Sequence, residues 1–132
     1  MKTFKLITSI RWSDTDKYSH VNNGRYFDYF EEVRTTWIYE FSELINWAIK
    51  NNIQLVISEQ TCKYRLPITH PNKLEVTQQV IKCGAVSIEL SYEIRILGQS
   101  EIVTSASVKL ACYNANTKRL EKIPSHIKQL IV

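Results

Sequence analysis

The sequence predicts an α+β fold in which one curved antiparallel sheet of about five strands wraps around a long central helix. Three observations carry this prediction. A segment near the N-terminus repeats apolar residues every three or four positions, later segments alternate between apolar and polar residues, and the turns between the alternating segments are short. Because short turns join only antiparallel neighbours, the alternating segments are expected to form one antiparallel sheet.

The chain has 132 residues, and we expect a single domain that covers residues 1–132. Apolar residues make up 44% and charged residues 23%, a balance that is typical of a folded globular protein and argues against disorder. No apolar run is long enough to span a membrane, and the first residues lack the apolar block of a signal peptide. We therefore expect a cytoplasmic protein.

The net charge of +4 favours an anionic ligand, such as a phosphorylated cofactor, or reflects only a mildly basic surface. The sequence holds no tight run of Lys and Arg and no nucleic-acid-binding motif, so we expect no nucleic-acid partner. Cys62, Cys83 and Cys112 lack C-x-x-C spacing, which argues against a zinc site and a disulfide framework. We interpret them as buried thiols and expect no bound metal.

The first expected strand covers residues 4–12, and a polar loop follows over 13–22. Helical spacing then runs from Asn23 to about Ile45, which gives a helix on the order of 33 Å long. Asn22 or Asn23 can cap its start. The apolar stripe of this helix includes Tyr26, Phe30, Val33, Trp37, Phe41 and Leu44.

The remaining strands are expected at 53–66, around 74–80, at 86–96 and at 101–113, joined as a meander. The segment 86–96 has the clearest pattern, because every second residue is apolar and its neighbours are Ser, Glu or Arg. A short segment after Pro124 could form one helical turn.

The loop before the helix concentrates the groups that could do chemistry. It carries the carboxylates of Asp14 and Asp16, the imidazole of His20 and the amides of Asn22 and Asn23. A helix N-terminus presents unpaired backbone N–H groups that can hold an anion. This combination suits attack on a carbonyl, where one group activates the nucleophile and another holds the developing oxyanion.

The carboxylate of Asp16 could act as a general base for water, as a direct nucleophile, or only as a cap of the loop and helix. Asp14 is expected to be structural. The oxyanion donor would be the backbone N–H of Asn23 or Gly24, and the glycine would also let a substrate approach the backbone closely. His20 could be a base, although we favour a positioning role.

Residues on the helix have structural alternatives. Tyr26 could line an acyl pocket, but its place in the apolar stripe makes it a core residue first. Glu31 and Arg34 lie three residues apart and could pair on the helix surface.

Residues 11–34 resemble the 4-hydroxybenzoyl-CoA thioesterase branch of the hotdog-fold acyl-CoA thioesterases. The similarity is strongest to a bacterial subgroup that carries Asp before His-Val-Asn-Asn, and plant acyl-ACP thioesterases have a related run. The matching residues are Trp12, Asp14, Asp16, His20, Val21, Asn22, Asn23, Tyr26, Tyr29, Phe30, Glu31 and Arg34.

This resemblance implies a hotdog fold and an acyl-CoA thioesterase that releases free acid and CoA. It implies that Asp16 is the catalytic carboxylate and that the backbone N–H of Asn23 polarises the thioester oxygen. It also implies active sites between two subunits, and hence a homodimer or homotetramer. CoA is part of the substrate, and no other cofactor is expected. The residues expected to bind substrate are Tyr18, His20, Asn22, Gly24 and Tyr26.

Alternatives remain open at this point. The chain could act on acyl carrier protein instead of CoA, or bind acyl-CoA without turnover. A hotdog hydratase is disfavoured because the Asn-x-Pro element of that motif is missing. Tyr18 stands where the family often has Ala or Asn, and Ser19 stands where it often has Gly, which could narrow the site. The sequence does not specify acyl length, aromatic or aliphatic preference, or whether Asp16 is base or nucleophile.

Overall fold

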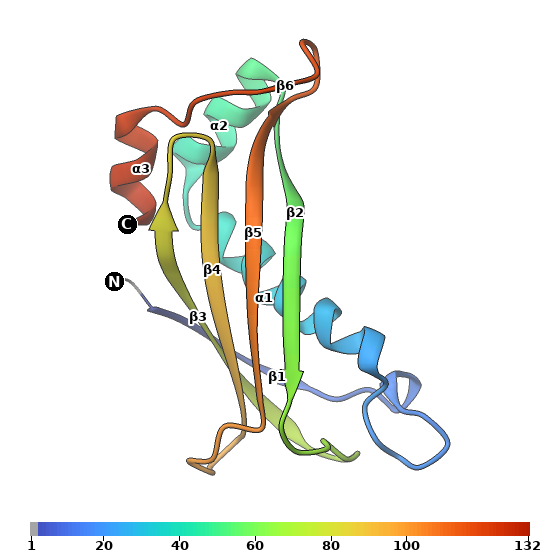
Figure 1. The fold of residues 1–132 in the computed structure, drawn as a ribbon. Helices are drawn as coiled ribbons and strands as arrows, with labels where there is room; N and C mark the ends of the chain where they lie inside the picture. Colours follow the sequence, from blue (N-terminus) through green and yellow to red (C-terminus); the bar gives the residue numbers. More distant parts are fainter. Residues whose placement is uncertain (1–2) are drawn as a thin grey trace.

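A curved antiparallel sheet forms one layer of the computed structural model, and helices pack on one of its faces (Figure 1). The structure describes residues 3–132. The strands lie in the order β1-β3-β4-β5-β2, with the short β6 paired to the end of β5. Their bounds are β1 (Thr3–Ser9), β2 (Ile53–Tyr64), β3 (Lys73–Cys83), β4 (Ser87–Ile96), β5 (Thr104–Asn114) and β6 (Arg119–Leu120).

The alternation along the strands produces the core. In β4 the apolar residues Ile88, Leu90, Tyr92 and Ile94 are buried, while their neighbours are partly exposed on the other face. The strand is antiparallel to both β3 and β5. The predicted antiparallel sheet is therefore confirmed, because the period of two decides which face of each strand the helices cover.

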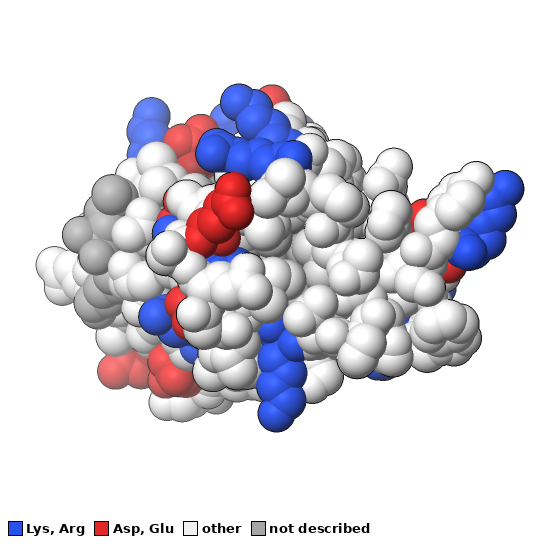
Figure 2. Space-filling model, turned by 90° about the horizontal axis from the view of Figure 1, so that it is seen from below, with Lys and Arg blue, Asp and Glu red and all other residues white. Residues whose placement is uncertain are grey.

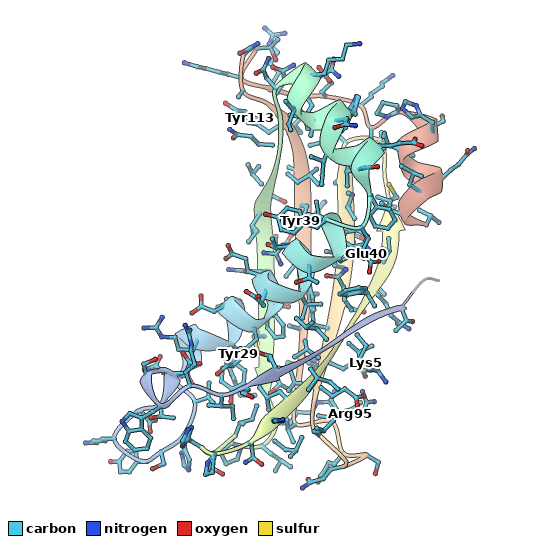
Figure 3. The ribbon with its side chains drawn as sticks, turned by 180° about the vertical axis from the view of Figure 1, so that it is seen from behind. Lys5, Tyr29, Tyr39, Glu40, Arg95 and Tyr113 are labelled. Carbon is cyan, nitrogen blue, oxygen red and sulfur yellow. The ribbon has the colours of Figure 1, made fainter. Side chains whose placement is uncertain are left out.

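The predicted continuous helix over 23–45 is wrong in one respect. A 3₁₀ turn (Asn23–Arg25) leads into α1 (Tyr26–Ile38), the chain then leaves the helical conformation, and α2 (Ser42–Asn51) starts in a new direction. Tyr39 and Glu40 lie at this bend (Figure 3). Phe41 has φ −113° and ψ 82°, outside the helical region, and its ring packs edge-on against Trp37 at 5.5 Å between ring centroids.

The bend changes which strands the helices cover. Contacts of α1 are with β1 and β3, whereas α2 lies against β2. The apolar spacing continues from Trp37 through Phe41 to the buried Leu44, so the stripe looks unbroken in the sequence. The two helices on either side of the break therefore cover different parts of the sheet.

The predicted four-strand meander is also wrong in part. Strands β3, β4 and β5 do form a meander, but β2 pairs with β5 instead of β3. The connection from β2 to β3 therefore crosses from one side of the sheet toward the other. As a result β2 is an edge strand, and one of its sides is left unpaired among residues 3–132.

The C-terminal segment forms α3 (Ser125–Ile131), which is longer than the single turn expected. Its buried residues Ile127 and Ile131 extend the core at the edge of the helical layer. Within residues 3–132, every helix is too short or too polar to cross a membrane.

Candidate active site

The polar loop before α1 is held in place by backbone hydrogen bonds. The N–H of Asp16 donates to the carbonyl of His20 at 2.7 Å and closes the loop on itself. The N–H of Val21 donates to the carbonyl of Ile68 at 2.8 Å, and the loop is thereby tied to the segment that precedes β3. The loop is therefore a fixed part of the fold, and its side chains have defined positions.

Asp14 anchors this loop to α1. It is 1% exposed, and it accepts hydrogen bonds from the Arg11 guanidinium at 3.0 Å and from the Tyr29 hydroxyl at 2.9 Å. Burial alone raises the pKa of Asp14, but the hydrogen bonds from Arg11 and Tyr29 outweigh it and bring the pKa below its ordinary value. Burial and the contact with Asp14 raise the pKa of Tyr29. This environment gives Asp14 a structural role, as the sequence predicts.

Asp16 has a different environment, because it is only half-buried. Its Oδ1 accepts hydrogen bonds from the backbone N–H groups of Tyr18 at 2.8 Å and His20 at 3.2 Å. Within residues 3–132 no donor reaches the second carboxylate oxygen, Oδ2. The carboxylate therefore caps the loop with one oxygen and keeps the other available for a ligand.

A pocket of about 270 Å³ lies beside this carboxylate, and we call it the Asp16 pocket. One wall comes from the loop and the helix start, and the other comes from the end of β2 and the residues that follow it. The lining residues are Asp16, His20, Val21, Asn23, Tyr26, Tyr64, Arg65, Leu66 and Pro67.

Two backbone N–H groups at the helix start were candidates for the oxyanion donor, and they differ in their partners. The side-chain oxygen of Asn22 accepts from the N–H of Gly24 at 3.1 Å, so that amide is occupied by the helix cap. The N–H of Asn23 has no acceptor in the part of the chain that the structure describes. Of the two donors that the sequence left open, the N–H of Asn23 is therefore the one available for an oxyanion.

The predicted substrate-binding residues fall into separate places. His20 and Tyr26 line the Asp16 pocket. Asn22 and Gly24 instead line a second, polar hollow of about 400 Å³ together with Ser13, Thr15, Arg25 and Asp28. Tyr18 is 67% exposed, and its ring lies 6.4 Å from that of His20, measured between centroids.

Tyr64 belongs to the site but is not among the predicted site residues. Its hydroxyl donates to the backbone carbonyl of Asn23 at 3.1 Å, and its ring meets that of Tyr26 edge-on at 4.8 Å between centroids. Tyr64 lies 41 residues after Asn23 in the sequence. Only the pairing order of the strands brings the two together, and the sequence carries no local signal for that order.

The expected pairing of Glu31 with Arg34 is wrong. Arg34 is 7% exposed and lies beneath α1, where its Nη1 donates to the Tyr92 hydroxyl at 3.3 Å. That hydroxyl donates in turn to Gln78 at 2.8 Å. No carboxylate is within ion-pair distance of Arg34 among residues 3–132. The guanidinium therefore belongs to a buried polar chain inside the core.

Two further features limit the possible chemistry of the described residues. Across residues 3–132 no group of three or more His, Cys, Asp or Glu side chains is placed to hold a metal ion. Seen from below, the Lys and Arg side chains stand at separate places with acidic and neutral residues between them (Figure 2). This face lacks the continuous basic surface, in the described part of the chain, that typically binds a nucleic-acid backbone.

Comparisons with known proteins agree on one family. The sequence model of the thioesterase-like superfamily matches residues 10–131. The chain is 27% identical to the long-chain acyl-CoA thioesterase FadM of Escherichia coli K12 over 120 residues, which are 91% of this chain and 90% of FadM.

Solved structures show the same fold. The probable thioesterase YbaW of Escherichia coli superposes with a TM-score of 0.87 at 24% identity, over 96% of this chain and 94% of YbaW. Protein SAV2348 of Staphylococcus aureus, solved in complex with CoA, superposes with a TM-score of 0.88 at 15% identity, over 98% of this chain and 82% of SAV2348. The predicted hotdog fold, with its curled antiparallel sheet, is thereby confirmed.

Proposed function

This chain belongs to the thioesterase-like superfamily, and we propose on that basis that it hydrolyses acyl-CoA to a free acid and CoA. The predicted enzyme class, a thioester hydrolase, is confirmed by the family match. The proposal goes further by naming CoA as the leaving group and the Asp16 pocket as the site. It also assigns the chain to the 4-hydroxybenzoyl-CoA thioesterase branch, on the residues around His20-Val21-Asn22-Asn23.

One observation carries the proposal: the same pocket is lined by a residue with a free carboxylate oxygen and by a residue whose backbone N–H has no acceptor among residues 3–132. Asp16 supplies the carboxylate and Asn23 the amide. A thioester whose carbonyl oxygen accepts from the Asn23 N–H would be polarised for attack.

The proposed reaction balances without another reagent. With Asp16 as base, the oxygen of a water molecule bonds to the thioester carbon while Asp16 takes a proton from that water. The tetrahedral oxyanion is held at the Asn23 N–H. Its collapse breaks the C–S bond, and the proton is returned to the CoA thiolate. With Asp16 as nucleophile, the carboxylate displaces CoA and forms an anhydride that water then hydrolyses.

The substitution Asp16→Asn tests the assignment. An asparagine oxygen can still accept the two loop N–H bonds, so the loop stays folded while the basic oxygen is lost. We expect the variant to lose most of its turnover on a panel of acyl-CoA substrates, followed by release of free thiol. Asp28→Asn is the matched control, because Asp28 is an exposed aspartate outside the Asp16 pocket. Full activity of Asp16→Asn would reject the proposal.

The choice between base and nucleophile needs a single turnover in water enriched in heavy oxygen. Label found only in the product acid favours direct attack by water. Label found in Asp16 by mass analysis of the enzyme favours the covalent anhydride.

Two alternatives are separated by simple assays. Acyl carrier protein as leaving group predicts faster release of acid from acyl-ACP than from acyl-CoA. A binding protein without activity predicts tight acyl-CoA binding with no free thiol. CoA is favoured here because the relative FadM is an acyl-CoA thioesterase and SAV2348 was solved with CoA.

We further propose that the chain is at least a homodimer paired along β2. The middle of this edge strand is exposed over residues 56–61, including Val56 at 37% and Ile57 at 44%. Unpaired strand edges with apolar side chains are normally covered in soluble proteins. Light scattering during size-exclusion chromatography measures the mass, and a monomer at micromolar concentration would contradict this assembly.

A further inference from the structure

We propose that Tyr64 is a positioning residue for the oxyanion donor, the backbone N–H of Asn23, and that a β-bulge at Ser58 directs the Tyr64 side chain to it. This inference rests on the proposed thioesterase function and adds two residues to the description of its site. The two peptide groups that meet at the Cα atom of Asn23 decide where the donor points, because each peptide group is planar and turns as a unit.

The first of these peptide groups, between Asn22 and Asn23, carries the donor. Its carbonyl accepts a hydrogen bond from the N–H of Arg25 at 2.9 Å. Its N–H, which belongs to Asn23, has no acceptor within residues 3–132. The carbonyl end is therefore held while the N–H end stays available for a ligand. A hydrogen bond at the carbonyl also polarises the N–H of the same peptide group.

The second peptide group, between Asn23 and Gly24, is held at both ends. Its N–H donates to the side-chain oxygen of Asn22 at 3.1 Å, and its carbonyl accepts from the Tyr64 hydroxyl at 3.1 Å. The Asn22 contact is local to the helix cap, whereas Tyr64 comes from the end of β2. Because the two peptide groups share one Cα atom, fixing the second limits how far the first can turn.

The Tyr64 side chain is suited to this role because it is itself held by the core. Its ring packs edge-on against that of Tyr26 at 4.8 Å between centroids, and Tyr26 is buried. Burial raises the pKa of Tyr64, so its hydroxyl keeps the proton and remains a donor at neutral pH. The hydroxyl is thus placed by α1 and aimed at the helix start.

An extra residue interrupts β2 before it reaches Tyr64. Ile57 lies opposite Leu110 of β5. The next pair along the two strands is Glu59 with Lys109, so Ser58 forms a β-bulge. The Ser58 hydroxyl donates to the backbone carbonyl of Lys109 at 3.2 Å and holds the bulge against β5. Bulges bend a strand and increase its twist, and next to active sites they re-aim side chains.

The bulge decides which side chains of β2 face the helices. In a regular strand, residues an odd number of positions apart point to opposite faces of the sheet. Leu55 and Cys62 are seven positions apart, and both nevertheless pack against the core. Tyr64 follows Cys62 by two residues and shares its face, whereas Lys63 points away. Regular alternation from Leu55 would instead turn Lys63 toward the helix start and Tyr64 away from it.

Removing the Tyr64 hydroxyl tests the positioning role. In Tyr64→Phe, kcat for acyl-CoA hydrolysis should fall roughly threefold to tenfold with KM unchanged, a part of the about 10²–10³-fold that loss of a whole oxyanion donor costs. Tyr113→Phe is the matched control, because Tyr113 pairs with the beginning of β2 at the far end of the sheet (Figure 3). A thioether analogue of acyl-CoA has no carbonyl oxygen, so its dissociation constant should be the same in wild type and Tyr64→Phe.

Removing the bulge tests how Tyr64 is directed. Deletion of Ser58 shortens β2 by one residue, so the strand pairs on both sides are kept and Tyr64 stays on its face, but the extra twist is lost. We expect kcat to fall to that of Tyr64→Phe, and adding Tyr64→Phe to the deletion should cause no further loss. Deletion of Ile81, the extra residue of a second bulge in β3, is the control and should leave kcat within about twofold of wild type.

Smaller changes at the bulge serve if the deletion variant does not fold. Ser58→Ala loses the hydrogen bond to the Lys109 carbonyl and should lower kcat by about twofold, because an exposed hydrogen bond contributes little. Ser58→Thr keeps a hydroxyl and should restore the wild-type value. Wild-type kcat in Ser58→Ala would then count against the bulge.

The remaining outcomes are distinct. Wild-type kcat in Tyr64→Phe, or a loss of the same size in Tyr113→Phe, would overturn the positioning role. Weaker binding of the thioether analogue to Tyr64→Phe would also overturn it, since the pocket as a whole would then be damaged. Wild-type kcat after deletion of Ser58, or additive losses in the double variant, would overturn the role of the bulge. Failure of the proposed function is seen separately, as wild-type protein without activity on acyl-CoA.

Discussion

Asp14 and Asp16 are two residues apart in the sequence and have opposite environments. Asp14 is buried, and its oxygens are bound by Arg11 and Tyr29. Asp16 is half-buried and lines a pocket, and among residues 3–132 it accepts hydrogen bonds from backbone N–H groups at one oxygen only. A carboxylate whose two oxygens are both hydrogen-bonded to side chains stabilises the fold, while a carboxylate that keeps one oxygen free can act on a ligand. The two roles are set by contacts, and the residue type is the same.

The largest expected difference between the two aspartates is in catalytic activity. Asp16→Asn lowers kcat by roughly 10²–10⁴-fold, the usual contribution of a general base or acid. Its urea unfolding midpoint should stay close to that of wild type, because the loop N–H groups keep their acceptor. A variant that loses activity together with a large part of its stability would show that Asp16 is structural, like Asp14.

The next largest expected difference between Asp14 and an exposed aspartate is in the free energy of unfolding. Asp14→Ala leaves the buried Tyr29 hydroxyl without its acceptor and should lower the free energy of unfolding by about 2 kcal/mol. Urea denaturation followed by fluorescence measures it. Asp28→Ala removes only the exposed ion pair with Arg25 and should cost less than about 1 kcal/mol. Equal losses in the two variants would contradict the anchoring role of Asp14.

The helix cap gives a smaller effect. Asn22→Ala removes the acceptor of the Gly24 N–H and should cost about 1 kcal/mol of stability. Asn22→Ser keeps a capping oxygen and should recover most of that loss in the same unfolding assay. A serine variant as unstable as the alanine variant would show that Asn22 acts by another contact.

The substitution Tyr64→Phe tests whether the Tyr64 hydroxyl positions the backbone of Asn23 in the Asp16 pocket. The lost hydrogen bond to the Asn23 carbonyl should lower stability by less than about 1 kcal/mol, because Tyr64 is 44% exposed. If this bond positions the Asn23 peptide for the oxyanion, kcat falls several-fold while KM is unchanged. A change in KM alone would indicate that Tyr64 only contacts the substrate.

The smallest effect is the pH dependence that Asp14 contributes. Its pKa is lower in the folded chain than in the unfolded chain, so its stabilisation is present above the unfolded value and is lost as pH falls through the folded value. Between about pH 6 and pH 3, wild type should therefore lose more stability than Asp14→Asn. Parallel curves for the two proteins, from urea midpoints at each pH, would contradict this linkage.

Local patterns in the sequence were sufficient for much of the fold. The alternation in residues 86–96 identified β4 and its buried face, because a period of two is a property of the strand itself. The helix bend was not predictable from spacing, since Trp37, Phe41 and Leu44 keep a helical interval across it. The position of β2 beside β5 could not be predicted from the sequence either, because strand order depends on contacts between distant segments.

The candidate site divides in the same way. Asp16, His20 and Asn23 lie within eight residues of one another in the sequence, so they were predicted to form one site. In the structure all three line the same pocket. Tyr64 was missed because it reaches the pocket only through the strand order. Arg34 was considered as a partner of Glu31 because the two lie three residues apart on the helix, whereas its buried contact with Tyr92 joins residues 58 positions apart.

The bend at Phe41 separates two tasks that a single straight helix would combine. Asn23 and Tyr26, which precede the bend, line the Asp16 pocket, whereas residues of α2 line a separate apolar hollow against β2. Substitutions on α2 therefore change the lining of that hollow and leave the residues of the Asp16 pocket in place. Related chains that share the loop can therefore differ in the residues of α2 while they keep the same residues in the Asp16 pocket.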